Sequence, residues 1–80
     1  MTIKTHNPEG FSQHDITVEA WREYHYGDGT YFIKGPTTLF LKRDDRGDSH
    51  RVVDANGVTH YPRRGWLAIS WRSDIEKVSF

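Results

Sequence analysis

The chain has 80 residues, with eleven acidic and eleven basic side chains and no cysteine. This length predicts one domain, and the absence of cysteine excludes a disulfide framework and a cysteine-based zinc site. A net charge of zero argues against an acidic mimic of nucleic acid and against a generally basic nucleic-acid binder. No apolar run reaches the length of a membrane span or a signal peptide, so we expect a cytoplasmic protein that does not bind membranes.

The chain begins with a segment that predicts a loosely held N-terminal arm, residues 1–13. It contains the turn cluster Asn7-Pro8-Glu9-Gly10 and little apolar periodicity, apart from a short strand at Thr2–Lys4. We expect the remainder, residues 14–80, to form a single β domain.

Residues 15–26 are compatible with two kinds of secondary structure. A helix would bring Ile16, Ala20 and Tyr24 onto one face, because they recur at every fourth position. A strand would place these three residues on one face and Trp21 on the other. The β-branched side chains near Ile16 favour the strand.

The middle of the chain alternates turn residues with short apolar runs. Glycines at 27 and 29 predict a hairpin turn, and Gly35-Pro36 breaks the strand that follows it. We expect strands at 31–34, 37–43 and 50–55, with a polar loop at 44–49.

Asn56-Gly57 is a strong signal for a two-residue type I′ turn, which requires positive φ at both positions. Centring the turn there would pair Val53 with His60 and Val52 with Tyr61, and would place His50 and His60 on opposite faces. Pro62 cannot donate a backbone hydrogen bond, so we expect pairing to end there.

The most hydrophobic strand follows a basic connection, at residues 66–71. Alternation places Leu67, Ile69 and Trp71 on one face, which we expect to be the centre of the core. Trp66 falls on the other face and should be at most half buried. After this strand, the capping-box pattern at 73–76 predicts one helical turn, and a last short strand ends the chain at 78–80.

Short strands separated by turn signals predict a mainly β fold with at most one short helix. A small single-domain barrel of the SH3-like kind is the first choice. An OB-like barrel and an open sheet carrying one helix are the alternatives.

No pattern in the chain predicts catalysis, a metal site or a cofactor. The five histidines lack the spacing of a zinc site, so we interpret them as hydrated surface residues. There is no cysteine nucleophile, no nucleophile elbow and no phosphate-binding glycine loop. Arg46-Gly47-Asp48-Ser49 matches the integrin-binding tripeptide with its usual follower, but it is also typical of a tight polar turn. We therefore expect a protein that is not an enzyme.

Two surfaces are candidates for binding. The first is a basic corner, defined by His50, Arg51, His60, Arg63 and Arg64 with Tyr61 and Trp66 between them, where arginines bind phosphate or carboxylate and aromatic rings stack bases. Its alternative is a solvated corner whose arginines pair with Asp54 and Asp74.

The second surface is Trp21 with Tyr26 and Tyr31, an outward aromatic group of the kind found at protein interfaces. Its alternative is that Trp21 packs under the N-terminal arm, or lies in the core of a helical segment. The expected binding residues are Trp21, Tyr26, Tyr31, Arg51, His60, Tyr61, Arg63, Arg64 and Trp66.

In size and composition the chain resembles small accessory proteins of phages and mobile elements, anti-CRISPR proteins among them, although no motif is shared. The resemblance implies a non-catalytic protein-interaction module that binds and inhibits a host complex. The alternative is a nucleic-acid-binding small β-barrel that uses Arg63 and Arg64.

Overall fold

Seven strands and no helix make up residues 10–73, the part of the chain that the computed structural model describes. The expectation of a mainly β fold is confirmed. The strands are β1 (Ser12–Asp15), β2 (Glu19–Tyr26), β3 (Gly29–Lys34), β4 (Pro36–Asp44), β5 (Gly47–Asp54), β6 (Thr59–His60) and β7 (Ala68–Ser73).

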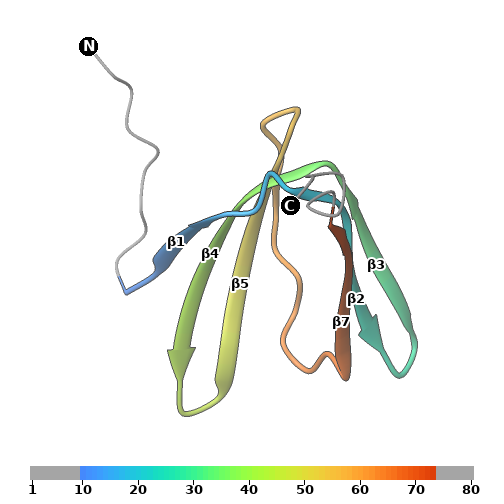
Figure 1. Ribbon diagram of the computed structural model, residues 1–80. Coiled ribbons are helices and arrows are strands. Elements are labelled where there is room, and N and C mark those ends of the chain that lie inside the picture. The colour runs from blue at the N-terminus through green and yellow to red at the C-terminus, as the bar shows by residue number, and fades with distance from the viewer. Residues whose placement is uncertain (1–9, 74–80) are drawn as a thin grey trace, which may run out of the picture.

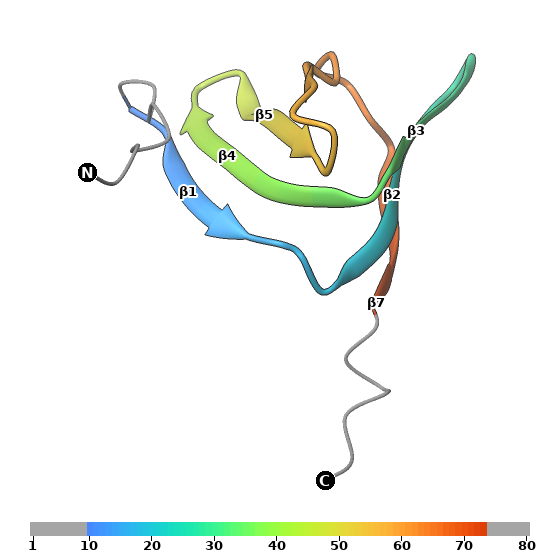
Figure 2. The same cartoon turned by 90° about the horizontal axis from the view of Figure 1, so that it is seen from above.

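The strands form two antiparallel sheets that face each other (Figure 1). One has the order β1-β4-β5-β6 and the other the order β3-β2-β7. Seen from above, the sheets lie at an angle, and the connection between β6 and β7 passes from one to the other (Figure 2). The described strands do not join into a closed barrel.

After a first crossing from β1 to β2, the chain crosses between the sheets again at Gly35, where β3 ends and β4 begins. Gly35 has φ +60, a left-handed conformation that glycine adopts without steric cost. Its N–H donates to the carbonyl of Ala20 and its own carbonyl accepts from Ala55. Gly35, which was expected to break a strand, therefore bends the chain from the β3-β2-β7 sheet into the β1-β4-β5-β6 sheet.

Residues 15–26 contain the end of β1, a turn and the whole of β2, and no helix. β1 ends at Asp15, whose carboxylate accepts hydrogen bonds from the N–H and hydroxyl of Thr17. β2 then starts at Glu19, and its pairing with β7 contains an irregularity between Glu19 and Trp21. This irregularity disturbs simple alternation: Glu19 is buried, although strict alternation would place it on the same outer face as Trp21.

The hairpin at Asn56-Gly57 exists, but its predicted turn type and register are wrong. Gly57 has φ +80, whereas no residue other than glycine has positive φ among those described, so the turn is not type I′. The Gly57 N–H donates to the carbonyl of Asp54, and Asp54 pairs with Val58 across a three-residue loop. Val52 therefore lies opposite His60, which places His50 and His60 on the same face.

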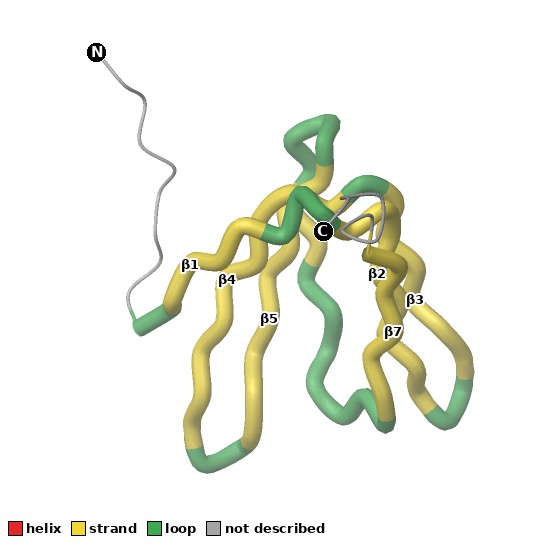
Figure 3. Tube along the Cα trace, in the orientation of Figure 1, coloured by secondary structure: helices red, strands yellow, loops and turns green. Residues whose placement is uncertain are grey.

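The turns collect at the two ends of the molecule (Figure 3). The hairpin turns after β2 and β4 and the start of β7 lie at one end, and the β5–β6 turn lies at the other. The polar loop expected at 44–49 is shorter than predicted, because β4 continues to Asp44 and β5 begins at Gly47.

The core lies between the sheets and does not centre on the strand that we expected. Leu67 is 77% exposed and Trp71 is 53% exposed, while Ile69 is half-buried against the core. The prediction was wrong because β7 is an edge strand: it has a neighbour, β2, on one side only. The buried cluster consists of Ile16, Tyr24, Ile33, Leu39 and Val52.

The described residues contain no helix that is long and apolar enough to cross a membrane. The strand expected at Thr2–Lys4, the helical turn after Ser73 and the strand at 78–80 lie outside the described residues.

Candidate binding groove

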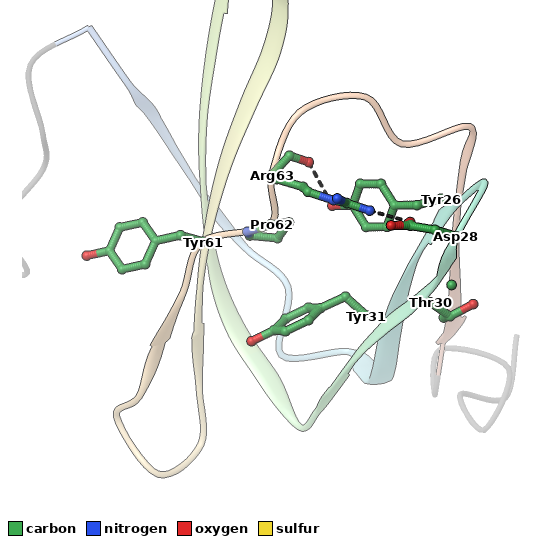
Figure 4. A pocket seen from close by; sticks show the side chains of 8 residues that line it. Tyr26, Asp28, Thr30, Tyr31, Tyr61, Pro62 and Arg63 are labelled. Carbon is green, nitrogen blue, oxygen red and sulfur yellow. Dashed lines mark hydrogen bonds and ion pairs between the residues drawn. The ribbon is translucent and has the colours of Figure 1, made fainter.

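A groove of about 440 Å³ opens between the β2–β3 hairpin and the connection from β6 to β7. We call it the tyrosine groove, because three of its lining residues are tyrosines. The side chains of Tyr26 and Tyr31 lie beside Arg63, whereas the ring of Tyr61 points away from them (Figure 4). Figure 4 shows Arg63 lying across the ring of Tyr26 towards Asp28, with Tyr31 below them. The lining residues are Tyr26, Asp28, Gly29, Thr30, Tyr31, Tyr61, Pro62 and Arg63.

Two hydrogen bonds fix the wall of the groove that carries Arg63. The Tyr26 hydroxyl donates to the carbonyl oxygen of Arg63 at 2.7 Å, and the Leu67 N–H donates to the carbonyl oxygen of His25 at 2.7 Å. The Arg63 guanidinium lies 4.4 Å from the centre of the Tyr26 ring and forms an ion pair with Asp28. Burial raises the pKa of the Tyr26 phenol, although the charge of Arg63 acts in the opposite direction.

Three hydrogen-bonded side chains, those of Tyr31, His60 and Asp54, join the groove to the β1-β4-β5-β6 sheet. The Tyr31 hydroxyl lies 2.6 Å from Nδ1 of His60, and Nε2 of His60 lies 2.8 Å from Oδ2 of Asp54. The hydrogen bond from His60, together with backbone N–H groups of Val58 and Asn56, lowers the pKa of Asp54 below its ordinary value. Asp54 is therefore a carboxylate at neutral pH.

Two of the three arginines of the basic corner, Arg63 and Arg64, are paired with carboxylates of the protein. Arg64 forms two hydrogen bonds with the Asp44 carboxylate, at 2.7 and 3.1 Å, and lowers the pKa of that group. Arg63 pairs with Asp28. The sequence pointed instead to Asp54 and Asp74 as partners: Asp54 pairs with His60, and Asp74 lies outside the described residues.

Arg51 takes a different position, on the outer side of the groove. Its guanidinium lies 4.6 Å from the ring centre of Phe11 and 5.4 Å from that of Tyr61. Tyr61 is itself 66% exposed at the rim of the groove. Arg51 is half-buried, so the exposed ring of Tyr61 forms the accessible part of this stacked pair.

His50 does not belong to the surface, contrary to the sequence-based interpretation. It is only 7% exposed, its Nδ1 lies 2.7 Å from the Tyr24 hydroxyl, and Trp66 packs against it at 4.6 Å between ring centres. Burial, with a contribution from the charge of Arg22, lowers the pKa of His50 to about 4. His50 is thus a neutral core residue.

The same network buries an ion pair that the sequence did not reveal. Arg22 contacts both carboxylate oxygens of Glu19, at 2.8 and 2.7 Å, and also donates to the Tyr24 hydroxyl. Burial acts to lower the pKa of Arg22, but its hydrogen bonds to Glu19 and Tyr24 outweigh this effect and raise it. Tyr24 and His50 of this network pack against the ring of Trp66.

The structure divides the nine expected binding residues among four places. Tyr26, Tyr31, Tyr61 and Arg63 line the tyrosine groove, and His60 contacts it through Tyr31. Arg51 stacks outside the rim. Arg64 and Trp66 line a second, smaller hollow of about 330 Å³ beside the β4–β5 turn.

Trp21 is separated from the two tyrosines with which we grouped it. It lies on the opposite face of its sheet, where its ring centre is 6.1 Å from that of Phe32. Phe32 is half exposed, so this face carries a small aromatic pair of its own.

Sequence reasoning missed Asp28 and Pro62 as groove residues. Asp28 was interpreted only as part of a turn and Pro62 only as the end of a strand. A salt bridge between Asp28 and Arg63 spans 35 positions, and no local pattern reveals such a pair.

Among residues 10–73, no group of three or more histidine, aspartate or glutamate side chains is arranged to hold a metal ion. Comparison of the chain with protein-family models, with curated proteins and with solved structures finds no match.

Proposed function

We propose that this protein is a non-catalytic protein-interaction module that binds its partner through the tyrosine groove. The observation that carries the proposal is the composition of the groove. Tyr26, Tyr31 and Tyr61 line it together with Pro62. Tyrosine and arginine are enriched among the residues that anchor protein interfaces, because they combine a large apolar surface with a polar group.

The charges around the groove support a protein partner over a nucleic acid. Binding to nucleic acid rests on uncompensated lysine and arginine contacts to phosphate. Arg63 and Arg64 are each paired with a carboxylate, so a phosphate would have to displace Asp28 or Asp44. The net charge of the chain, which is zero, offers no long-range attraction either.

We further propose that the fold is an SH3-like barrel that remains open. The continuous segment from β3 to β4 belongs to both sheets, and β7 returns to pair with β2. In this arrangement the groove lies at the side where the two sheets separate.

We also propose that the module inhibits a host complex in the cytoplasm, as an accessory protein of a phage or mobile element does. This part of the proposal rests on the size and composition of the chain.

The proposal is tested by affinity capture from a lysate of the source cells, followed by mass spectrometry with and without nuclease. We expect a partner that resists nuclease. Tyr31→Ala should weaken its capture by roughly 30-fold or more, the effect of removing an aromatic anchor worth about 2 kcal/mol. Val58→Ala is the matched control, because Val58 is also half exposed and lies outside the groove.

A nucleic-acid-binding barrel is the second candidate, and the stacked Arg51 favours it. Within the described residues Arg51 forms no ion pair with a carboxylate, and the rings of Phe11 and Tyr61 beside it offer a surface for base stacking. In that case Arg63→Ala and Arg64→Ala would weaken binding to unrelated sequences equally. Each change would also flatten the logarithmic salt slope by about one unit. Loss of capture on nuclease treatment, with such a salt slope, would replace the first proposal by the second.

A further inference from the structure

Two of the three groove tyrosines, Tyr26 and Tyr31, use their hydroxyl protons inside the protein, and the ring of Tyr61 points away from them (Figure 4). A phenol hydroxyl has one proton to donate and two lone pairs that accept. Tyr26 donates its proton to the carbonyl oxygen of Arg63 at 2.7 Å, since a carbonyl can only accept. Towards a ligand, the oxygen of Tyr26 can therefore act only as an acceptor.

The Tyr31 hydroxyl can likewise only accept a hydrogen bond from a ligand, because of its contact with His60. The Asp54 carboxylate can only accept, so Nε2 of His60, at 2.8 Å from Oδ2, must carry a proton. In the neutral ring Nδ1 then carries none, and the Tyr31 hydroxyl at 2.6 Å must donate to it. With His60 neutral, Tyr31 also offers only acceptor lone pairs to the groove.

These hydrogen-bond directions limit the chemistry of a ligand. It needs a hydrogen-bond donor, and a flat apolar body without an acceptor would pack against the Tyr31 ring and Pro62. A lysine or arginine of the partner is disfavoured, because the Arg63 guanidinium already lies between Tyr26 and Asp28 and would repel a second cation. A tryptophan side chain fits, since its indole has one N–H donor and no acceptor.

We propose that the tyrosine groove binds a tryptophan indole of the partner, whose N–H donates to the Tyr31 hydroxyl, and that protonation of His60 releases it. The inference rests on the proposed function and specifies the ligand and the regulation of the same site.

The release follows from the geometry around His60, which is largely buried, with its side chain 17% exposed. In the described part of the chain, the groups that face it are Asp54 of β5 and Tyr31 of β3. A second proton on the ring occupies Nδ1, which then donates to the Tyr31 oxygen. The Tyr31 proton must turn away from His60, and Nδ1–H takes one of the two lone pairs. The hydroxyl then presents a proton and a single lone pair in place of two lone pairs, which disfavours an indole N–H.

The experiment uses indole and 1-methylindole as probes, because they share a ring and differ in the N–H. The full chain, labelled with ¹⁵N, is titrated with each probe and observed by NMR. We expect indole to bind about three- to tenfold more tightly, the effect of one neutral hydrogen bond. Tyr31→Phe, which keeps the ring, should bring this ratio to one. The ratio should also fall as the ring nitrogen signals show His60 gaining its second proton.

The variant Asp54→Asn changes the tautomer of the neutral His60 ring without changing its charge. An asparagine oxygen can still accept from the backbone N–H groups of Asn56 and Val58, which keeps the turn. Its amide donates to Nε2 and moves the ring proton to Nδ1, so Tyr31 becomes an acceptor for His60 without any change in pH. The preference for indole should therefore be lost in Asp54→Asn at neutral pH.

The outcomes distinguish this inference from the proposed function. Equal binding of both probes to the unmodified protein, or an unchanged indole preference in Asp54→Asn, would overturn the inference and leave the groove as a binding site. If neither probe shifts the signals of groove residues, both the inference and the assignment of the groove are overturned.

Discussion

Tyr24 lies at the centre of the core, with its hydroxyl between Arg22 and His50. Arg22 donates to the Tyr24 oxygen at 3.2 Å, so Tyr24 directs its own proton to Nδ1 of His50 at 2.7 Å. This arrangement requires an unprotonated Nδ1. The low pKa of His50, about 4, has the same origin, since burial and then the charge of Arg22 disfavour the protonated ring.

The first prediction is that the free energy of unfolding decreases as the pH falls from about 6.5 to about 4. The unfolded chain takes up a proton at the ordinary histidine pKa of about 6.5, whereas folded His50 resists protonation down to about 4. The full loss is of the order of 3 kcal/mol. Urea denaturation at a series of pH values measures it, and His50→Gln should flatten the curve in this range. A slope that is the same in both proteins would contradict the assignment of His50 as a buried neutral residue.

The burial of His50 illustrates what sequence reasoning about single residues cannot provide. His50 follows a polar loop and precedes an arginine, a context typical of a surface residue. Its burial depends on Trp66, whose ring lies 4.6 Å away and which is 16 positions further along the chain. Distant packing of this kind leaves no local pattern.

In the β5–β6 hairpin, the side chain of Asp54 determines the turn type and the strand register. Asp54 accepts hydrogen bonds from the N–H groups of Asn56 and Val58, at 2.9 and 3.0 Å, and stabilises a three-residue loop. Asn56 therefore keeps negative φ, and only Gly57 takes the left-handed conformation. The position of the turn was predictable from Asn56-Gly57. The register was not, because Asp54 competes with the two-residue turn.

The second prediction concerns this turn. Gly57→Ala should destabilise the protein by about 1–2 kcal/mol, because Gly57 has φ +80 while no atom would obstruct the added methyl group. Gly27→Ala is the matched control, since Gly27 also lies in a hairpin turn and has open space but no positive φ. It should be neutral or stabilise by at most about 1 kcal/mol. Thermal unfolding measures both, and equal losses would contradict the observed turn.

The third prediction concerns the position of the core relative to β7. Ile33→Ala should cost about 2–5 kcal/mol, because Ile33 is fully buried between the sheets. Leu67→Ala should change the stability by less than about 0.5 kcal/mol, because Leu67 is exposed. Urea denaturation of the two variants checks this. A large loss in Leu67→Ala with a small one in Ile33→Ala would restore the core that the alternation of 66–71 predicted.

At the scale of the whole molecule, the strands were largely predictable and their assembly was not. Alternating residues and turn signals located most strands, but an open two-sheet fold depends on the bend at Gly35 and on the connection from β6 to β7. Ion pairs hold that connection to both sheets: Arg63 pairs with Asp28 and Arg64 with Asp44. These pairs compensate two of the three arginines of the basic corner, which the sequence presented as a positive surface.

The two sheets also place the aromatic residues differently from the grouping that the sequence predicted. Trp21 and Tyr26 alternate in sequence to opposite faces of β2, and only the inner one joins the groove. Tyr61 directly follows β6, a strand of the β1-β4-β5-β6 sheet. The groove thus combines halves of two surfaces that sequence reasoning treated as separate candidates.

The central claim, that the tyrosine groove contacts the partner, is tested most directly by site-specific photo-crosslinking. The chain carries p-benzoylphenylalanine either at the rim of the groove, Tyr61→p-benzoylphenylalanine, or outside it, Val58→p-benzoylphenylalanine; both positions are exposed. After irradiation in source-cell lysate treated with nuclease, we predict a covalent adduct with one protein from position 61 and none from position 58. An adduct from position 58 alone, or from both positions equally, would contradict the account.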